Sequence, residues 1–304
     1  MVAPAVEPPV VIGLDVGGTK IRSGLLDRDG NVLEEREVTG PGTSEDEVLA
    51  ALDSAVDGLL GDRVAAIGYG IPANIERGSG RVLWATNLPL TDVDLKNRSQ
   101  ERFGLPVGIE NDASAAALAE WKLGAGRGRA NLLMLTLGTG VGGGIVVDGG
   151  LFRGWAEIGH VVVREGGREC TCGGHGHLEV LASGSAADAA ARELYGDDAD
   201  AHTLVARARS GDEAAENALA RIGGTLGAAI GSLVNVFDPE LVVIGGGFGA
   251  AAGALVLDPA RESARLEAIY PANATLDVVA AELGQEAGLV GAGLVGFEAL
   301  DGLR

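Results

Sequence analysis

The sequence of 304 residues predicts an α/β protein, and three observations support this class. Apolar runs rich in valine, isoleucine and leucine end in clusters of glycine, as strands do where they lead into tight loops. Alanine-rich stretches typical of helices lie between these runs. Apolar residues make up 46% of the chain, so hydrophobic cores can form, and the length fits two domains.

The expected elements begin with a strand at residues 10–16, which leads into a glycine turn at Gly17. A second apolar strand follows the turn and ends near Asp27. Residues 132–148 repeat this pattern of strand, glycine turn and strand, and an alignment without gaps places Gly17 on Gly138. Such self-similarity predicts two domains that are built on one plan.

The glycine loops of the two repeats are interpreted as hairpin tips. Gly138–Gly143 has the letters of a dinucleotide-binding fingerprint, but that fingerprint needs a helix after the loop, and a strand is expected at residues 144–148. Residues 15–20 do not match a Walker phosphate loop. Backbone amides at two facing tips would hold a polyphosphate from both sides, and a pair of ordinary tight hairpins is the alternative.

Three later elements complete the α/β pattern. A helix is expected at residues 113–123, and Asn111 or Asp112 would be a natural cap for it. Residues 241–257 fit a buried strand, a glycine loop and a helix better than a membrane span. Residues 285–303 fit a closing helix, because their leucine, valine and phenylalanine side chains have near-helical spacing.

The charge balance argues against several classes of function. The chain has 23 basic and 43 acidic residues and a formal net charge of -20. This charge repels phosphate backbones and anionic lipid, so we expect no nucleic-acid and no membrane partner. The two cysteines are one residue apart and cannot form a disulfide framework, which indicates a reducing compartment. Residues 1–9 contain no basic residue and do not resemble a secretion signal, so we expect a cytoplasmic protein.

Side chains that bind metals gather in one short segment of the chain. They are His160, Cys170, Cys172, His175 and His177. Clustered histidine and cysteine in a reducing compartment favour a tetrahedral zinc site. A glycine-rich loop with two free thiols and no metal is the alternative. The remaining histidine, His202, lies in a charged, alanine-rich helical region and is expected on the surface.

Four motifs, in this order, give the chain a family resemblance. They are Asp15–Lys20 (Asp-Val-Gly-Gly-Thr-Lys), Leu137–Gly144, Glu157–His160 and Cys170–Glu179. Together they resemble the ROK family (repressors, open reading frames, kinases) and, within it, the bacterial ATP-dependent glucokinases. The resemblance implies the actin-like, ribonuclease-H-like architecture of two α/β domains hinged around a cleft. The small domain would take residues 10–112 and a terminal helix at about 286–302, and the large domain would take residues 113–285 with the zinc-binding loop.

The same resemblance implies a kinase that transfers phosphate from ATP to the 6-hydroxyl of a hexose, with glucose the first expectation and glucose 6-phosphate its product. Asp112 would be the general base, and Asn111, Asp112, Glu157, His160 and Glu179 would bind the sugar. Asp15 would hold Mg²⁺ through water, although an aspartate that bonds its own turn is the alternative. The nucleotide would lie against Asp15, Gly17, Gly18, Thr19, Lys20, Gly138, Thr139, Gly140, Gly246 and Gly247.

In the family, the zinc ligands are one histidine and three cysteines. His160, Cys170 and Cys172 match the first three positions, and His177 stands where the family has its last cysteine. His175 is an alternative fourth ligand. The zinc would be structural, because it would fix one nitrogen of His160 and leave the other for a sugar hydroxyl. The family also implies a homo-oligomer, either a dimer or a tetramer.

Other functions are weighed against this one. A kinase for fructose, N-acetylmannosamine or N-acetylglucosamine would carry the same motifs. A sugar-responsive repressor would need a DNA-binding domain before the first hairpin, and only nine residues of this sequence precede that strand. Polyphosphate is a poor donor for so acidic a chain. A dehydrogenase that used residues 241–247 would leave the paired hairpins and the cysteine segment unexplained.

Overall fold

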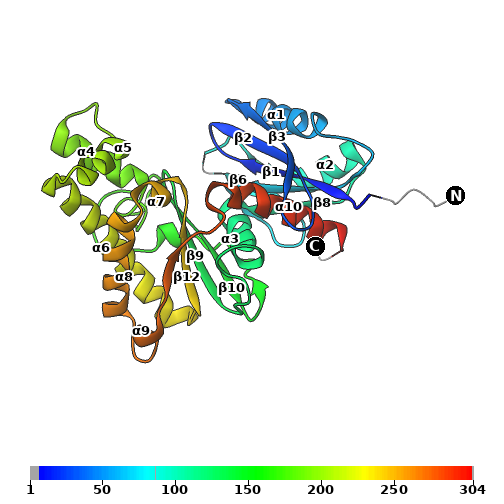
Figure 1. The fold of residues 1–304 in the computed structure, drawn as a ribbon. Coiled ribbons are helices and arrows are strands. Elements are labelled where there is room, and N and C mark those ends of the chain that lie inside the picture. Colours follow the sequence, from blue (N-terminus) through cyan, green and yellow to red (C-terminus); the bar gives the residue numbers. More distant parts are fainter. Residues whose placement is uncertain (1–6, 86, 303–304) are drawn as a thin grey trace. The chain divides into compact units, whose positions relative to one another are not determined.

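The structure is a computed structural model that describes residues 7–85 and 87–302 (Figure 1). The chain divides into two compact units, each of which is described by itself. Unit 1 contains the chain up to Ala119, the short segment Arg153–Trp155 and the chain from Glu286 onward, and unit 2 contains the rest. Residues 1–6, which form part of the segment where no secretion signal is expected, lie outside the described residues.

Unit 1 is built on a five-stranded sheet with the strand order β3-β2-β1-β4-β8. The first three strands are antiparallel neighbours, whereas β4 pairs in parallel with both β1 and β8. These strands are β1 (Val10–Val16), β2 (Lys20–Leu26), β3 (Val32–Thr39), β4 (Val64–Ile71) and β8 (Val107–Asn111). A second sheet of three short strands lies between β4 and β8 in the sequence: β5 (Ala73–Ile75), β6 (Val82–Ala85) and β7 (Thr91–Val93).

Alternation of side chains along β1 lets helices cover both faces of this sheet. Ile12 and Leu14 are buried in one core with residues of α1 (Glu45–Asp57), whereas Gly13 between them faces α10 (Ala287–Leu300). A Cβ atom at Gly13 would lie 2.8 Å from the backbone nitrogen of Gly293, so only glycine lets α10 approach so closely. The helix α10 also packs on β4 and β8. Unit 1 also contains α2 (Leu95–Phe103) and most of α3 (Asp112–Lys122).

Unit 2 repeats the plan of unit 1. Its five-stranded sheet has the order β11-β10-β9-β12-β13, in which β9 and β10 form an antiparallel hairpin and β12 pairs in parallel with β9 and β13. The strands are β9 (Leu132–Leu137), β10 (Val141–Val147), β11 (Gly150–Leu151), β12 (Leu241–Gly245) and β13 (Val278–Ala280). In both units the first hairpin is followed by parallel strands, so the internal repeat that the sequence predicts is confirmed.

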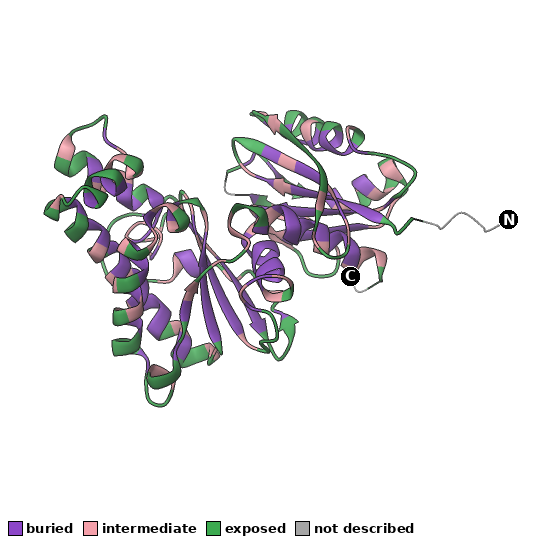
Figure 2. Ribbon diagram, in the orientation of Figure 1, coloured by how far each residue is buried: buried purple, intermediate pink, exposed green. Residues whose placement is uncertain are grey.

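The helices of unit 2 cover a sheet whose strands are mostly buried (Figure 2). The longest, α6, packs lengthwise against α8. The helices are α4 (Gly184–Tyr195), α5 (Ala201–Arg209), α6 (Glu213–Phe237), α7 (Gly247–Ala252), α8 (Ala254–Glu267) and α9 (Ala272–Thr275). The described residues also form two short 3₁₀ turns, η1 (Ile158–His160) and η2 (Gly284–Glu286). Residues 241–257 form β12, α7 and the start of α8, as the sequence predicts.

Among the described residues, α6 is the one helix with the length and composition of a membrane span. A core helix of a globular protein passes the same test. One face of α6 is buried in the core of unit 2, where Leu219, Leu226 and Ile230 are fully covered. Its first turn carries Glu213 and Glu216, beyond an aspartate cap at Asp212. The buried face and the acidic start fit a core helix.

The chain passes between the two units near one buried carboxylate. Helix α3 leaves unit 1 after Ala119, and the chain returns to it at Glu286. The side chain of Glu120, which is fully buried, accepts hydrogen bonds from the backbone N–H groups of Ala125 at 2.9 Å, Glu282 at 3.1 Å and Leu283 at 2.7 Å. Glu120 therefore fastens the end of α3 to the segment that leads back into unit 1.

Candidate active site and metal centre

The tip of the β1–β2 hairpin in unit 1 is formed by Gly17, Gly18 and Thr19. The Gly17 N–H donates to the Lys20 carbonyl at 2.8 Å, which closes the tight turn. All three tip residues are at least partly exposed, so their backbone is open to a ligand. Lys20 itself is exposed and forms an ion pair with Glu37 at 2.8 Å.

Asp15 lies near the end of β1, directly opposite Arg22 on β2. Its carboxylate lies against Gly288 in the first turn of α10. Burial raises the pKa of Asp15, and the positive charges of Arg22 and Lys20 oppose that shift. Arg22 is in turn held by Glu35 at 2.7 Å and by Glu286 at 2.8 Å. Asp15 is thus a partly buried carboxyl group that the fold holds beside the first turn of α10.

The β9–β10 hairpin of unit 2 borders a cavity of about 510 Å³. Three of the predicted nucleotide-binding residues, Gly138, Thr139 and Gly247, line it. The start of α4 is fastened to the hairpin tip, because the Gly184 N–H donates to the Gly138 carbonyl at 2.8 Å and the Ser185 N–H donates to the Thr139 carbonyl at 3.2 Å. The cavity therefore combines a hairpin tip with the first turns of three helices, α4, α5 and α7.

Two more predicted residues lie beside this cavity. Gly246 precedes α7 with a φ of 84°, and a Cβ there would lie 2.4 Å from the Leu137 carbonyl oxygen, so only glycine fits between β9 and β12. Gly140 completes the hairpin tip, where its carbonyl accepts from the Gly138 N–H at 3.0 Å. The structure therefore places every predicted glycine of unit 2 at one end of its sheet.

Several residues of this cavity escaped the sequence analysis. Asp188 of α4, Phe248 of α7, Gln285 and His202 of α5 all line it. His202 is exposed, as expected, but the surface that it occupies is the wall of the cavity. Asp188 accepts the Ala201 N–H at 2.7 Å and so fastens the start of α5 to α4. The packing of α4 and α5 brings Asp188 and His202 to the hairpin, and no motif in the sequence indicates that packing.

Asn111 and Asp112 lie at the junction of β8 and α3 in unit 1. The Asn111 Oδ1 atom accepts the N–H groups of Ala113 at 3.0 Å and Ser114 at 3.1 Å, which makes Asn111 the cap of the helix. The Asn111 amide also donates to the Ala73 carbonyl at 3.4 Å. The Asp112 carboxylate accepts the Ala113 N–H at 2.9 Å. Of the two caps that the sequence allows, the structure selects Asn111 and places Asp112 in the electropositive first turn of α3.

Glu110 directly precedes Asn111, is buried, and belongs to a network of charged side chains. One of its carboxylate oxygens accepts the Asn111 N–H at 3.1 Å, and the other accepts from Arg153 at 2.7 Å. Arg153 also donates to Glu298 of α10 at 2.7 Å. Burial raises the pKa of Glu110, while the positive charge of Arg153 opposes this.

The three predicted sugar contacts of unit 2 lie around η1. Glu157 is exposed and immediately precedes η1, and His160 is its last residue. Glu179 is brought beside them because its N–H donates to the Gly159 carbonyl at 2.9 Å. One oxygen of the Glu179 carboxylate accepts the Val141 N–H at 3.2 Å, at the start of β10. The structure thus gathers these side chains next to the β9–β10 hairpin.

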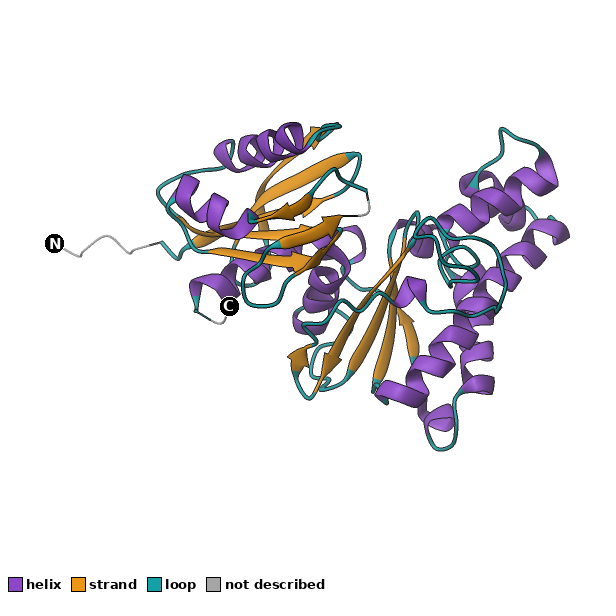
Figure 3. Cartoon of the chain, turned by 180° about the vertical axis from the view of Figure 1, so that it is seen from behind, coloured by secondary structure: helices purple, strands orange, loops and turns teal. Residues whose placement is uncertain are grey.

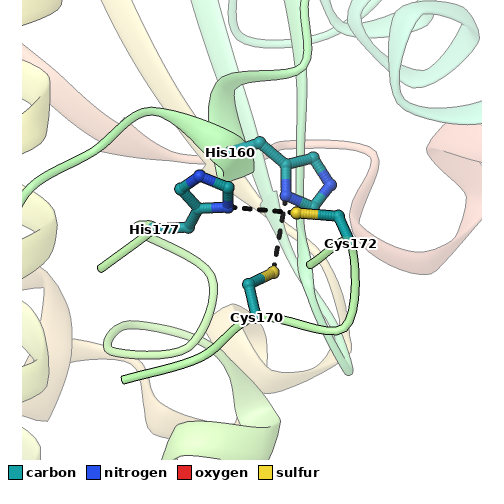
Figure 4. Close-up of side chains that lie close together, drawn as sticks. All are labelled: His160, Cys170, Cys172 and His177. Atoms are coloured by element: carbon teal, nitrogen blue, oxygen red, sulfur yellow. Dashed lines mark hydrogen bonds between the residues drawn. The ribbon is translucent and has the colours of Figure 1, made fainter. Parts of the chain in front are cut away.

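The four preferred metal ligands come together in a loop of unit 2 (Figure 4). The donor atoms of His160, Cys170, Cys172 and His177 all lie within 4.8 Å of one another. The His160 Nδ1 atom is 3.6 Å from the Cys170 sulfur, and the His177 Nδ1 atom is 3.3 Å from the Cys172 sulfur. His175 is not in this group and instead forms a β-bridge with Glu169.

The donor set fits zinc. Bond lengths of about 2.0 Å to nitrogen and about 2.3 Å to sulfur at a tetrahedral angle separate the two donors by roughly 3.5 Å. The two nitrogen–sulfur distances of 3.3 and 3.6 Å lie on either side of that value. In Figure 4 the His160 Nε2 atom lies on the side of the ring away from the sulfurs. A metal on Nδ1 would therefore leave Nε2 available to another group.

Known proteins of one family are similar to this chain over nearly its whole length. The family model described as the ROK family matches residues 11–296. The chain belongs to the ROK family. A glucokinase of Streptomyces coelicolor is 36% identical over 306 residues, which cover 93% of this chain and 96% of that protein. An N-acetylmannosamine kinase of Shigella flexneri is 36% identical over 294 residues, which cover 94% of this chain and 97% of that protein.

The fold is also similar to that of a solved ROK family structure. The crystal structure of a ROK family glucokinase from Streptomyces griseus, in complex with glucose and AMPPNP, has 35% sequence identity and a TM-score of 0.84. The match covers 95% of this chain and 99% of that one. This ROK chain therefore has the actin-like two-domain fold of ROK sugar kinases, and both the fold class and the family resemblance predicted from the sequence are confirmed.

Proposed function

We propose that this ROK chain is an ATP-dependent hexokinase that phosphorylates the 6-hydroxyl of glucose. The observation that carries the proposal is the junction of β8 and α3, where the Asp112 carboxylate lies beside the helix cap Asn111. The similarity to glucokinases over almost the whole chain supports glucose as substrate and ATP as donor. The proposed product is glucose 6-phosphate, formed in the cytoplasm.

In the proposed reaction, Asp112 accepts the proton of the sugar 6-hydroxyl while the hydroxyl oxygen bonds to the γ-phosphorus of ATP. The bond between that phosphorus and the β–γ bridging oxygen breaks, and ADP leaves. The first turn of α3 favours the ionised carboxylate, because the amino end of a helix is electropositive. Asn111, Glu157, His160 and Glu179 are proposed to bind the other hydroxyls and to orient the sugar.

The nucleotide is proposed to bind at the two hairpin tips, Gly17–Thr19 and Gly138–Gly140, with Gly246 and Gly247 beside the adenosine. The N–H groups of Gly17 and Gly138 close their own turns, so the proposed phosphate donors are the backbone amides that follow them in each tip. Amide groups at such turns bind anions without adding charge, which suits a chain of net charge -20. Lys20 would add one positive charge once it leaves Glu37. Bound Mg²⁺ neutralises charge on the phosphates, and Asp15 offers a carboxylate that would hold its water shell.

Zinc is proposed as a structural ion in the cluster of His160, Cys170, Cys172 and His177. When bound, it supplies a fixed anchor for the loop and takes no part in phosphoryl transfer. His160 would then be held through Nδ1, so that Nε2 is oriented toward a sugar hydroxyl. In this role the residues of the cluster position the substrate.

The test is a coupled ATP assay of Asp112→Asn over a panel of hexoses. Loss of the base should lower kcat with glucose by about 10²- to 10⁴-fold, because general-base catalysis contributes that much. Asp94→Asn is the matched control, since Asp94 caps α2 in the same unit and has no role in the proposed chemistry. Asp112→Asn activity within about tenfold of wild type, with Asp94→Asn unchanged, would remove Asp112 from the mechanism.

N-acetylmannosamine is the second candidate substrate, because an N-acetylmannosamine kinase is also 36% identical to this chain, over 294 residues. The hexose panel separates the two candidates directly. A higher kcat/KM for N-acetylmannosamine than for glucose would change the substrate and leave the proposed mechanism in place. A homo-oligomer, dimer or tetramer, is also proposed, and light scattering of the purified protein measures it.

A further inference from the structure

The ion pair of Arg153 and Glu110 lies next to the residues that are proposed to bind and deprotonate the sugar. Glu110 links Arg153 to the backbone N–H of Asn111 through its two carboxylate oxygens, at 2.7 and 3.1 Å. The Asn111 side chain caps α3, and Asp112 follows directly. A chain of short contacts therefore leads from Arg153 to Asp112 with Glu110 and Asn111 between them.

Arg153 is itself held from two sides. One terminal nitrogen donates to Glu110 on β8 and the other donates to Glu298 on α10, both at 2.7 Å. Arg153 belongs to unit 1 by its contacts, although the chain on either side of Arg153–Trp155 belongs to unit 2. The arginine thus joins an edge strand, the closing helix and a distant segment of the chain at one point.

We propose that Arg153 is a positioning residue, which acts through Glu110 to hold Asn111 and Asp112 in the geometry that phosphoryl transfer requires. This inference rests on the proposed function. It names a residue that does not touch the reacting atoms and that no sequence motif indicated. Small displacements of a catalytic group are costly in rate, so a residue that fixes the group is important without contacting the substrate.

Electrostatics supports this role. Glu110 is buried, and burial alone favours its neutral form, whereas Arg153 favours the carboxylate. A carboxylate is a stronger hydrogen-bond acceptor than a neutral carboxyl group, so Arg153 strengthens the bond from the Asn111 N–H. Without the arginine, the buried Glu110 would lose the positive charge that favours its carboxylate form, and this loosens its hold on Asn111.

A matched control exists elsewhere in the same unit. Arg98 and Asp53 form a bidentate pair with both distances at 2.7 Å. Their side chains are 35% and 11% exposed, against 36% and 10% for Arg153 and Glu110. The Arg98 pair joins α2 to α1, where both terminal nitrogens of Arg98 donate to Asp53 and Asp53 also pairs with Arg102 at 3.3 Å. Arg98→Ala therefore removes a similar ion pair without touching the proposed path.

The experiment compares Arg153→Ala, Arg153→Lys and Arg98→Ala with wild type, using whichever hexose the wild type phosphorylates fastest. Arg153→Ala should lower kcat/KM for the sugar by about 10²-fold and leave KM for ATP near wild type, because a misplaced catalytic group costs that much. Arg153→Lys should recover part of the loss, since it keeps the charge. Arg98→Ala should keep wild-type kcat/KM. A wild type that phosphorylates another hexose but not glucose would overturn the proposed substrate and leave the role of Arg153 in place.

Chemical rescue separates positioning from folding. Arg153 and Glu110 line a cavity of about 290 Å³, so a guanidinium ion from solvent can enter the space that Arg153→Ala leaves. Low concentrations of guanidinium chloride should restore activity to Arg153→Ala and not to Arg98→Ala, whereas sodium chloride at equal ionic strength should restore neither. Equal activity of the two alanine variants, or no response of Arg153→Ala to either lysine or guanidinium, would overturn the proposal.

Discussion

At the scale of single residues, Asp15 shows how a site can oppose the stability of the fold that carries it. Burial raises the pKa of its carboxyl group, so the folded chain favours the neutral form more than the unfolded chain does. The proposed role toward Mg²⁺ requires the charged form. Burial therefore makes the ionised carboxylate less favourable in the folded chain than in the unfolded chain, although the proposed role uses that form.

We expect Asp15→Asn to raise the thermal unfolding temperature at pH 7 and to abolish most of the kinase activity. Because the Asp15 pKa is raised on folding, wild-type stability falls as pH rises through that pKa. Below the ordinary pKa of aspartate both states are protonated, so the stability difference between wild type and variant should vanish there. Calorimetry between pH 3 and pH 7 measures this, and a variant that is less stable than wild type at pH 7 would contradict it.

The sequence predicts the local interactions of the site better than those between residues far apart in the chain. The helix cap and the tight turn at Gly17 depend on neighbouring residues, so the sequence predicts the turn and narrows the cap to Asn111 or Asp112, of which the structure has Asn111. The pair of Arg153 and Glu110 joins residues 43 positions apart, so no local pattern reveals it. His202 was assigned to the surface because nothing in the sequence shows which surface α5 presents to the β9–β10 hairpin.

At the scale of elements, the segment between η1 and α4 is held by hydrogen bonds of turns and isolated bridges, not by those of a helix or a sheet. None of residues 161–182, all of which the structure describes, belongs to a helix or a longer strand (Figure 3). Its order comes from two isolated bridges and from turns such as the Cys170 N–H to Gly174 carbonyl bond at 2.8 Å. A segment with so little regular structure is the kind that a metal ion stabilises.

We expect the purified protein to contain about one equivalent of zinc, as a four-ligand structural site does. His177→Ala should lose most of that zinc and should raise KM for the sugar more than KM for ATP, because His160 would lose its anchor. His175→Ala is the matched control and should keep the metal. Elemental analysis of the three proteins decides between the ligands, and zinc retained by His177→Ala but lost from His175→Ala would reverse the assignment.

The elements themselves were more predictable than their contacts. Both hairpins, α3, β12 and α10 follow from apolar runs, glycine turns and helical spacing. The helices α4 and α5 differ from them because they are placed by long-range bonds such as that from the Ala201 N–H to Asp188. The sequence contains their helical composition but not the position at which they meet the sheet.

At the scale of the whole molecule, Glu120 is the carboxylate that fastens the end of α3 to the segment just before Glu286, where the chain re-enters unit 1. We expect Glu120→Ala to lower the free energy of unfolding by about 3 kcal/mol or more, because three buried N–H donors would lose their acceptor. Glu120→Gln should cost less, since its amide oxygen can still accept. Denaturant unfolding measures both, and equal stability of Glu120→Ala and wild type would contradict the role of this carboxylate.

The helix α10 has a further consequence for how this protein is made. It packs on β1, β4 and β8, yet it follows the whole of unit 2 in the sequence. A ribosome therefore releases the whole of unit 2 before unit 1 can finish its core. Until then the glycine-lined face of the first sheet stays open to water and to other nascent chains. A premature stop codon shortly before Glu286 would leave that face uncovered permanently, and the shortened product should aggregate or be degraded.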